Sequence, residues 1–357
     1  MSLNKHTICF FCLQLSRGGS ERVTSILGNY FCKQGYDTTI VTLEKAPIDY
    51  HIESGINVVC LSEGKYRNII SIIKKLKLIF DNKDVIVVMN NRPIVLTAIC
   101  SKFSKARKIY SERNAPNKVP NGFVARIIRN ISFKTADAYV FQTEEQAHYY
   151  GKQAVEHSRI IMNPISDNLP VRNYKKDNKV IISVCRYDRQ KNLYMAVDAF
   201  TIFWKDHKDY KFELYGRGPE EGVINKYIQS KGMQNSIKLK RFHNNIHEIM
   251  ANATAFILSS DYEGISNSMI EAMGIGLPVI CTDCPVGGAR KIIQHGINGF
   301  LVGVGDVKRM AYYLNLVVDD NMIQKSIGCN AKKIRDELSI SKICAQWYEY
   351  IEEVLDK

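Results

Sequence analysis

Residues 179–204 read KVIISVCRYDRQKNLYMAVDAFTIFW. The run Lys179 to Cys185 is short, apolar and rich in β-branched residues, which predicts a buried strand. A polar loop follows, and Leu193 to Trp204 then places apolar residues at helical spacing, which predicts a helix. A buried strand followed directly by a helix is typical of a parallel sheet covered by helices, so this stretch indicates the α/β class.

The same alternation of short apolar runs and helical patterns continues along most of the chain. Helices are predicted between most of the strands, for example at Glu21 to Lys33, Glu220 to Lys231 and Ser268 to Met273. Two such series in a row predict two doubly wound parallel-sheet domains. The predicted strands are Thr7 to Leu13, Thr38 to Leu43, Val85 to Met89, Lys108 to Ser111, Ala138 to Gln142, Lys179 to Cys185, Lys211 to Tyr215, Ile237 to Leu239, Ala255 to Leu258 and Val279 to Thr282.

A domain boundary is predicted at Met162 to Ile165, which contains a proline and precedes the polar stretch Ser166 to Asn178. We therefore predict Rossmann-like domains at 1–166 and 167–340 that face each other across a ligand-binding cleft. The last predicted helix, in 341–357, has an apolar stripe that is expected to pack back on the first domain. Its stripe consists of Ile343, Trp347, Ile351 and Val354.

The charge of the chain indicates an anionic partner. Of 357 residues, 49 are Lys or Arg and 36 are Asp or Glu, a net charge of +13. Residues 1–166 hold 23 basic and 13 acidic side chains, so the first domain carries +10 of that total. Nucleic acid, anionic lipid and a phosphorylated small molecule all fit such a balance.

Composition excludes several other classes of protein. No apolar run approaches the roughly 18 residues of a membrane span, and no small-residue cleavage site follows Ile8 to Leu13, so we predict a cytoplasmic location. The ten cysteines are then expected to be reduced thiols. The pairs Cys9/Cys12 and Cys281/Cys284 imitate zinc motifs. Cys9 and Cys12 lie on a predicted strand, where residues three apart face opposite sides, and core or loop positions are expected for both pairs.

Three loops that follow predicted strands could bind an anion. Gly18 and Gly19 permit a positive φ and a close ligand approach ahead of a helix, although a plain tight turn fits equally well. Arg186 at a strand end and Lys191 at the start of the next helix could converge on one diphosphate, the alternative being solvated surface cations. Gly216, in the sequence GRGP at 216–219, fits a site of backbone approach.

The stretch Ser259 to Met273 combines a loop with two carboxylates. Glu263 lies just beyond a predicted strand, and Glu271 lies within the following helix. Both could accept hydrogen bonds from sugar hydroxyls, while backbone N–H groups of Ile265, Ser266 and Asn267 could point at a phosphate. The alternative for Glu271 is an ion pair with a neighbouring arginine.

Taken in order, these motifs resemble the retaining glycosyltransferases of family four, which have the GT-B fold. The motifs are GGSER at 18–22, Arg186 with Lys191, GRGP at 216–219, Glu263 with Glu271, GLPV at 276–279 and NGFLV at 298–302. Within the family, the segments 111–114 and 282–288 look most similar to bacterial enzymes that extend polyprenyl-diphosphate-linked, capsule or O-antigen glycans.

The resemblance implies roles for individual residues. Arg186 and Lys191 would neutralise the nucleotide diphosphate, Glu271 would bind the ribose hydroxyls, and Glu263 would orient the donor sugar. Gly264, Ile265, Ser266 and Asn267 would supply backbone donors, and Gly18 and Gly19 would let the first domain approach the phosphate. Arg113 stands where many relatives have a histidine and is expected to serve as a cation near the donor. Lys291 and Arg241 depart from the family pattern of glutamate and glycine.

Metal-independent catalysis is expected. The sequence contains no D-x-D motif, and the segment Asp261 to Glu263 only imitates the acidic metal site of the other large glycosyltransferase fold. Arg186 and Lys191 could do the work of a metal cation. His243 and His247 are four residues apart, but no third ligand is near in sequence, so they are expected to be ordinary polar side chains.

Two basic amphipathic segments indicate a membrane surface. In 67–80 the apolar face holds Ile69, Ile72 and Leu76, whereas Arg67, Lys74, Lys75 and Lys77 lie opposite, with Ile70 and Leu78 among the cations. Residues 123–134 contribute Arg126, Arg129 and Lys134. Such helices could rest on the anionic inner face of the cytoplasmic membrane, the alternative being ordinary helices with a solvated face.

Together these features predict a retaining transfer of a hexosamine or hexose from a UDP-sugar to a lipid-linked glycan acceptor, with no cofactor. One alternative is a nucleic-acid-binding protein, which would interleave aromatic residues with the cations, whereas the amphipathic segments carry aliphatic ones. A second alternative is a UDP-sugar epimerase of similar architecture, which would need no acceptor.

Overall fold

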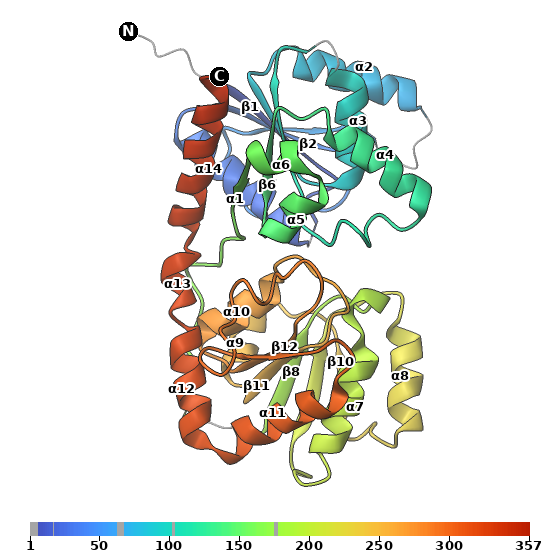
Figure 1. The fold of residues 1–357 in the computed structure, drawn as a ribbon, viewed down its shortest axis with the longest axis vertical. Coiled ribbons are helices and arrows are strands. Elements are labelled where there is room, and N and C mark those ends of the chain that lie inside the picture. The colour runs from blue at the N-terminus through green and yellow to red at the C-terminus, as the bar shows by residue number, and fades with distance from the viewer. Residues whose placement is uncertain (1–5, 17, 63–67, 102–103, 175–177) are drawn as a thin grey trace. The chain divides into compact units, whose positions relative to one another are not determined.

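A computed structural model describes residues 6–16, 18–62, 68–101, 104–174 and 178–357. The chain forms two compact units, the first made of Met1–Pro164 with Ile340–Lys357 and the second of Ile165–Ser339 (Figure 1). Each unit is an α/β domain with an all-parallel sheet, which confirms the predicted fold class. No helix within the described ranges is long and apolar enough to cross a bilayer.

The first unit is built on a seven-stranded sheet in the order β3-β2-β1-β4-β5-β6-β7. Its central strands are continuous buried apolar runs, as expected for a parallel sheet covered on both faces. The strands are β1 (Thr7–Cys12), β2 (Asp37–Thr42), β3 (Asn57–Cys60), β4 (Val85–Val88), β5 (Arg107–Ser111), β6 (Ala138–Phe141) and β7 (Ser158–Ile160).

Helices cover both faces of this sheet. Neighbouring residues of β1 point to opposite faces, so Phe11 meets Phe80 of α2 while Phe10 meets Phe31 of α1. The first face is covered by α2 to α6, and the second by α1 and α14 (Figure 1). The helices are α1 (Gly19–Lys33), α2 (Ile69–Phe80), α3 (Asn91–Cys100), α4 (Phe123–Phe133), α5 (Glu144–Tyr149), α6 (Lys152–Glu156) and α14 (Ile340–Leu355).

The last helix, α14, completes the first unit. Its predicted stripe of Ile343, Trp347, Ile351 and Val354 is buried. Tyr348 stacks on Phe31 of α1 with ring centroids 5.8 Å apart. The first unit is therefore assembled from two separate segments of the chain.

The second unit has a six-stranded sheet in the order β10-β9-β8-β11-β12-β13. The strands are β8 (Val180–Val184), β9 (Lys211–Tyr215), β10 (Ile237–Lys240), β11 (Ala255–Leu258), β12 (Val279–Thr282) and β13 (Phe300–Val302). The helices are a short 3₁₀ turn η2 (Arg189–Lys191), α7 (Leu193–Phe203), α8 (Glu221–Ser230), α9 (Ile246–Ala251), α10 (Asn267–Ile275), α11 (Val307–Asp319), α12 (Asn321–Ala331) and α13 (Ile334–Glu337).

Gly18 is extended at φ −168° and Gly19 begins α1, so neither residue uses the positive φ that glycine permits. Two expectations about local structure are wrong. Arg129, expected on an exposed basic face of 123–134, is fully buried because it pairs with Glu112. Ile69, expected on the buried face of 67–80, is exposed because α2 packs through Ile72, Leu76 and Phe80. Arg67 lies outside the described residues.

Candidate functional site

The strand order of the second unit indicates where a ligand binds. From β8 the chain builds outward through β9 and β10, then returns to the other side of β8 with β11. Ligands of doubly wound sheets bind beyond the carboxyl ends of the strands at such a reversal. The loops that follow β8 and β11 are 185–192 and 259–266, which contain Arg186, Lys191 and Glu263.

Hydrogen bonds fasten these two loops to each other. The amide of Asp261 donates to the Gln190 carbonyl at 2.8 Å, and Asn192 Nδ2 donates to Asp261 Oδ1 at 2.7 Å. Ser259 Oγ donates to the Lys191 carbonyl at 2.9 Å. Asn192 has a left-handed backbone with φ 42° and caps α7 by accepting from the Met195 amide. The backbone beneath Lys191 is therefore fixed from both sides.

Lys191 forms a mostly buried ion pair with Glu263. Its Nζ contacts Glu263 Oε2, which also accepts a hydrogen bond from Ser260 Oγ at 3.1 Å. Burial alone would lower the pKa of Lys191, but Glu263, Cys185 and Asp188 outweigh it and raise that pKa. Lys191 is therefore a fixed cation at neutral pH.

Asp188 lies near both predicted diphosphate-binding cations. The Nε of Arg186 is 3.6 Å from Asp188 Oδ2, and the Arg186 side chain is otherwise exposed. Burial raises the pKa of Asp188, although the charges of Lys191 and Arg186 both oppose this rise. Its Oδ1 atom is buried without a hydrogen-bond partner. Asp188 thus offsets the repulsion between two cations at one strand end, a role that the sequence analysis missed.

The start of α10 adds a second anion-binding element. Ser266 has an extended backbone and makes no side-chain cap, so the positive end of the helix dipole follows loop 259–266 directly. Glu271 is buried one turn into α10, and its Oε2 is 3.2 Å from His247 Nε2 of α9. His247 is therefore one partner of Glu271, and it comes from a different helix. His243 precedes α9, so the two histidines do not share a helix face.

The glycines of the second unit bring loops into close contact. A Cβ on Gly216 would lie 1.9 Å from the Cys185 carbonyl oxygen, and one on Gly218 would lie 2.1 Å from that of Tyr187. A Cβ on Gly288 would lie 1.9 Å from the carbonyl oxygen of Gly264. Because they lack a Cβ, these glycines allow the neighbouring loops to pack closely against 185–187 and Gly264. Close packing therefore explains glycine at these positions, in addition to the expected approach of a ligand.

Gly18, Gly19 and Arg113 belong to the first unit, whereas the other predicted site residues lie in the second. The Tyr50 hydroxyl donates to the Gly18 carbonyl at 2.8 Å and accepts from its amide at 3.0 Å. Arg113 donates through Nη1 to Asn163 Oδ1 at 3.0 Å and lies over the ring of Trp347. Burial lowers the pKa of Arg113 to about 9. Arg113 thus contacts α14, and its expected role near the donor stays a prediction.

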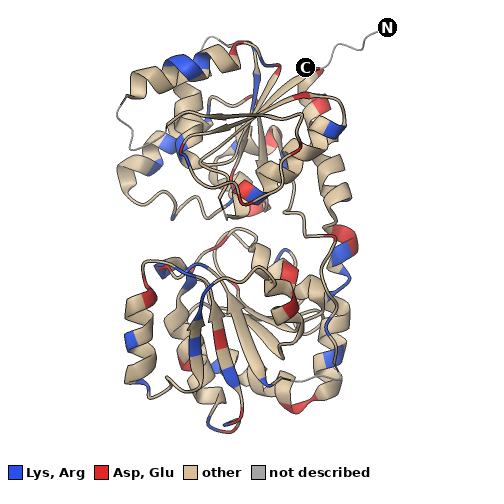
Figure 2. Cartoon of the chain, turned by 180° about the vertical axis from the view of Figure 1, so that it is seen from behind, with Lys and Arg blue, Asp and Glu red and all other residues tan. Residues whose placement is uncertain are grey.

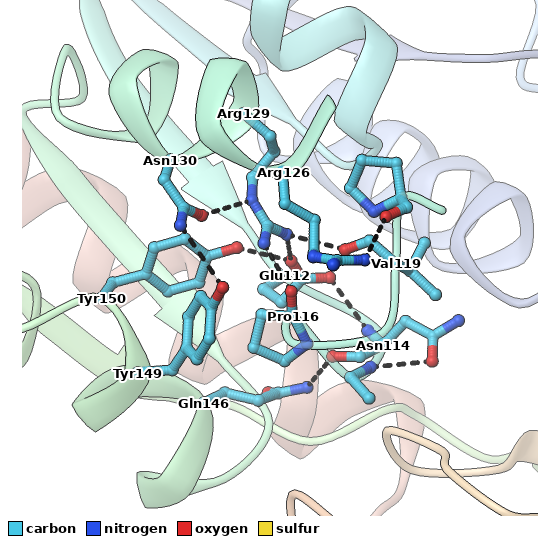
Figure 3. A network of polar contacts seen from close by, with 12 residues as sticks. Glu112, Asn114, Pro116, Val119, Arg126, Arg129, Asn130, Gln146, Tyr149 and Tyr150 are labelled. Carbon is cyan, nitrogen blue, oxygen red and sulfur yellow. Dashed lines mark hydrogen bonds and ion pairs between the residues drawn. The ribbon is translucent and has the colours of Figure 1, made fainter. Parts of the chain in front are cut away.

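A buried network holds the loop that carries Arg113. Figure 3 shows Arg129 of α4 reaching Glu112, with Nη1 2.9 Å from Glu112 Oε2. The same oxygen accepts from the Tyr150 hydroxyl at 2.7 Å, while Oε1 accepts from the amides of Arg113 and Asn114. Arg129 also donates to the carbonyls of Pro116 and Val119. One ion pair therefore fixes both ends of loop 112–119.

A metal site is not apparent in the described part of the chain, where no group of three or more His, Cys, Asp or Glu side chains could hold an ion. Both cysteine pairs are buried, as expected for core thiols. Burial raises the pKa of the Cys9 thiol, and of the Cys284 thiol, to about 12. Burial therefore favours the neutral form of these thiols.

Comparison with known proteins identifies related glycosyltransferases. Residues 166–334 match the family "Glycosyl transferases group 1". An uncharacterized glycosyltransferase of Haemophilus influenzae is 24% identical over 95% of this chain and 98% of its own length. A GalNAc-α-(1→4)-GalNAc-α-(1→3)-diNAcBac-PP-undecaprenol α-1,4-N-acetyl-D-galactosaminyltransferase of Campylobacter jejuni is 24% identical over 97% of this chain and 98% of its own.

Solved structures share the fold across both units. HepE of Anabaena, in complex with UDP and glucose, superposes with a TM-score of 0.82 at 20% identity, covering 97% of this chain and 99% of that one. Sucrose-phosphate synthase of Thermosynechococcus elongatus gives a TM-score of 0.86 at 14% identity, covering 99% and 100%. The second unit therefore matches the group 1 glycosyltransferase family, and the chain as a whole has the GT-B fold of these neighbours.

Proposed function

We propose that this glycosyltransferase transfers a hexosamine or hexose from a UDP-sugar to a lipid-linked glycan, with retention of anomeric configuration and without a metal ion. Such a reaction would belong to the assembly of bacterial surface polysaccharides or oligosaccharides. The observation that carries the proposal is the grouping of Lys191, Arg186 and the start of α10 at the reversal of strand order in the second unit.

Negative charge develops on the diphosphate as it leaves the donor sugar, and cationic side chains in the donor site would stabilise that charge. Lys191 is held as a buried point charge, and Arg186 offers an exposed planar fork, so both could contact phosphate oxygens as the glycosidic bond breaks. Gly264 to Asn267 would add backbone donors, and Glu263 would orient the sugar. The β-phosphate oxygen would take the acceptor proton on the face from which it leaves, so catalysis is positioning plus charge stabilisation.

The choice of donor and acceptor is supported by named relatives. HepE of Anabaena was crystallised with UDP and with UDP-glucose. Two Campylobacter jejuni relatives have names that specify undecaprenol-diphosphate-linked acceptors. One of these relatives is 24% identical over 97% of this chain. We therefore propose a lipid-linked acceptor for this chain as well.

Replacing Glu271 by alanine is expected to abolish stabilisation by UDP and UDP-sugars. The buried carboxylate would accept hydrogen bonds from both ribose hydroxyls, and a ligand at about 100 times its Kd adds about 2.7 kcal/mol to the free energy of unfolding of the protein that binds it. The measurement is thermal unfolding with a panel of sugar nucleotides. Glu248→Ala, on exposed α9 surface, is the matched control and should keep the protection of the parent. Equal protection of Glu271→Ala and the parent would exclude the ribose contact.

Removal of divalent metals is expected to leave UDP release from the preferred UDP-sugar within about twofold of its rate, because Lys191 and Arg186 stabilise the leaving charge themselves. The assay compares protein dialysed against EDTA with the same protein supplemented with Mg²⁺ or Mn²⁺. A strict requirement for Mn²⁺ would overturn the metal-independent mechanism while leaving the glycosyltransferase assignment intact.

A further inference from the structure

Helix α4 presents its apolar side to solvent. Phe123, Val124 and Ile131 are 71%, 67% and 62% exposed, and Ile127 and Ile128 are exposed as well. At 3.6 residues per turn these five side chains fall within an arc of about 140°. They therefore form one continuous apolar stripe and not a scatter of single exposed residues.

The opposite side of α4 holds the helix on the first unit. It carries Phe133, which stacks on Tyr150. It also carries Arg129, which is fully buried against Glu112, as Figure 3 shows. An ordinary surface helix would place its apolar stripe inward and its arginine outward. The arrangement of α4 is the reverse, and the ion pair anchors it without using the apolar stripe.

Two neighbouring helices extend the apolar stripe. Helix α3 packs between α2 and α4 and exposes Ile99 (Figure 1). Helix α2 exposes Ile69, Ile70 and Leu78, the last of these to 69%. The three helices lie on the same face of the seven-stranded sheet. Leu76 of α2, Ile94 of α3 and Phe133 of α4 all belong to the hydrophobic core on that face.

The charge of these helices has one sign only. The segments Ile69–Phe80, Asn91–Cys100 and Phe123–Phe133 contain no Asp or Glu. Lys74, Lys75 and Lys77 are exposed on α2, and Lys134 is exposed at the end of α4. Figure 2 shows blue segments, which mark Lys and Arg, on helix α2. In α2, Ile70, Lys74 and Leu78 follow one another at intervals of four residues, so lysine and apolar side chains share one side of the helix.

We propose that the exposed residues of α2, α3 and α4, here called the α2–α4 surface, dock the protein on an anionic lipid bilayer. The apolar side chains would enter the boundary between headgroups and acyl chains, while the lysines would meet lipid phosphates. The surface is complementary to such a layer in both respects. Phe123 is its one exposed aromatic residue, so it lacks the stacking side chains that single-stranded nucleic acid requires.

The test is flotation of the full chain with vesicles of equal parts phosphatidylglycerol and phosphatidylcholine, against vesicles of phosphatidylcholine alone. Phe123→Ser with Ile131→Ser is expected to reduce the partition coefficient on the anionic vesicles about tenfold or more, because two large apolar side chains no longer insert. Lys74→Gln with Lys75→Gln and Lys77→Gln is expected to reduce the partition coefficient by a similar factor. Added salt is expected to weaken binding of the parent in the same way, because it screens the lysine charges.

Matched controls separate this surface from general stickiness. Met322→Ser with Val223→Ser removes exposed apolar side chains of the second unit, and Lys332→Gln with Lys333→Gln removes exposed charge there; all should bind vesicles like the parent. All the substituted side chains are exposed, so folding should be retained and is checked by far-UV circular dichroism.

Two results would overturn the proposal. One is binding of the Phe123→Ser, Ile131→Ser variant equal to that of the parent. The other is failure of the parent protein to bind anionic vesicles together with formation of a dimer that the Phe123→Ser, Ile131→Ser substitutions dissociate. The α2–α4 surface would then bind a second copy of the chain. The vesicles contain no sugar acceptor, so this test is independent of the proposed reaction.

Discussion

Replacing Lys191 by methionine is expected to lower kcat/KM for UDP release from the preferred UDP-sugar about a thousandfold. In the proposed mechanism Lys191 is a mostly buried cation that stabilises the leaving diphosphate, and losing one such preorganised group typically costs two to three powers of ten, or about 3 to 4 kcal/mol. The assay follows UDP release from the donor identified by the thermal panel.

The same substitution leaves Glu263 as a mostly buried carboxylate without its cation, so a loss of folding must be separated from a loss of catalysis. Lys191→Met combined with Glu263→Gln removes both charges and should recover most of the lost stability but none of the activity. Lys226→Met, on exposed α8 surface, should match the parent in both measurements. A folded Lys191→Met protein with turnover within threefold of the parent would exclude Lys191 from catalysis.

Replacing Arg129 by methionine is expected to cause the largest loss of stability among single substitutions in the first unit, about 3 to 5 kcal/mol in the free energy of unfolding. Methionine fills much of the same volume but leaves the Glu112 carboxylate buried beside Tyr150 and removes the donors to Pro116 and Val119. The measurement is urea unfolding followed by tryptophan fluorescence.

Tryptophan fluorescence can report on the unfolding of the first unit alone. It has two tryptophans, Trp204 in the second unit and the buried Trp347 in the first, so a Trp204→Phe background reports on the first unit alone. Arg126→Met is the matched control, since Arg126 makes only one long hydrogen bond, 3.4 Å to the Pro120 carbonyl, and should cost about 0.5 kcal/mol or less. Adding Glu112→Gln to Arg129→Met should restore part of the stability. Equal costs at Arg126 and Arg129 would contradict this account of the network.

The sequence predicts the parts of the fold that depend on buried apolar runs. The ten predicted strands all form. The central ones are marked by apolar runs, because a parallel strand covered on both faces is apolar, whereas β9 and β10 are marked by alternation of apolar and charged residues. The missed strands β3, β7 and β13 are short, and β3 has mostly exposed side chains, so neither periodicity nor composition marks them. The placement of Arg186, Lys191 and Glu263 in neighbouring loops could be predicted because the ends of parallel strands meet at one edge of a sheet, while their roles stay predictions.

What the sequence could not supply is the pairing of charges across the fold. Arg129 has the position of a surface cation on a helical wheel, and only the structure places Glu112, 17 residues away, against it. Asp188 lies between two cations in the sequence but has no motif of its own. The histidine partner of Glu271 comes from another helix, and helical spacing gives no information about contacts between helices.

The attachment of α14 to the first unit constrains the order in which the protein can mature. During synthesis, residues 1–164 leave the ribosome before α14, so the side of α1 that Tyr348 covers stays exposed until α14 has emerged. The second unit lies between these two segments of the chain. Deleting α14 would therefore damage the first unit and spare the second, although α14 follows the second unit in the sequence.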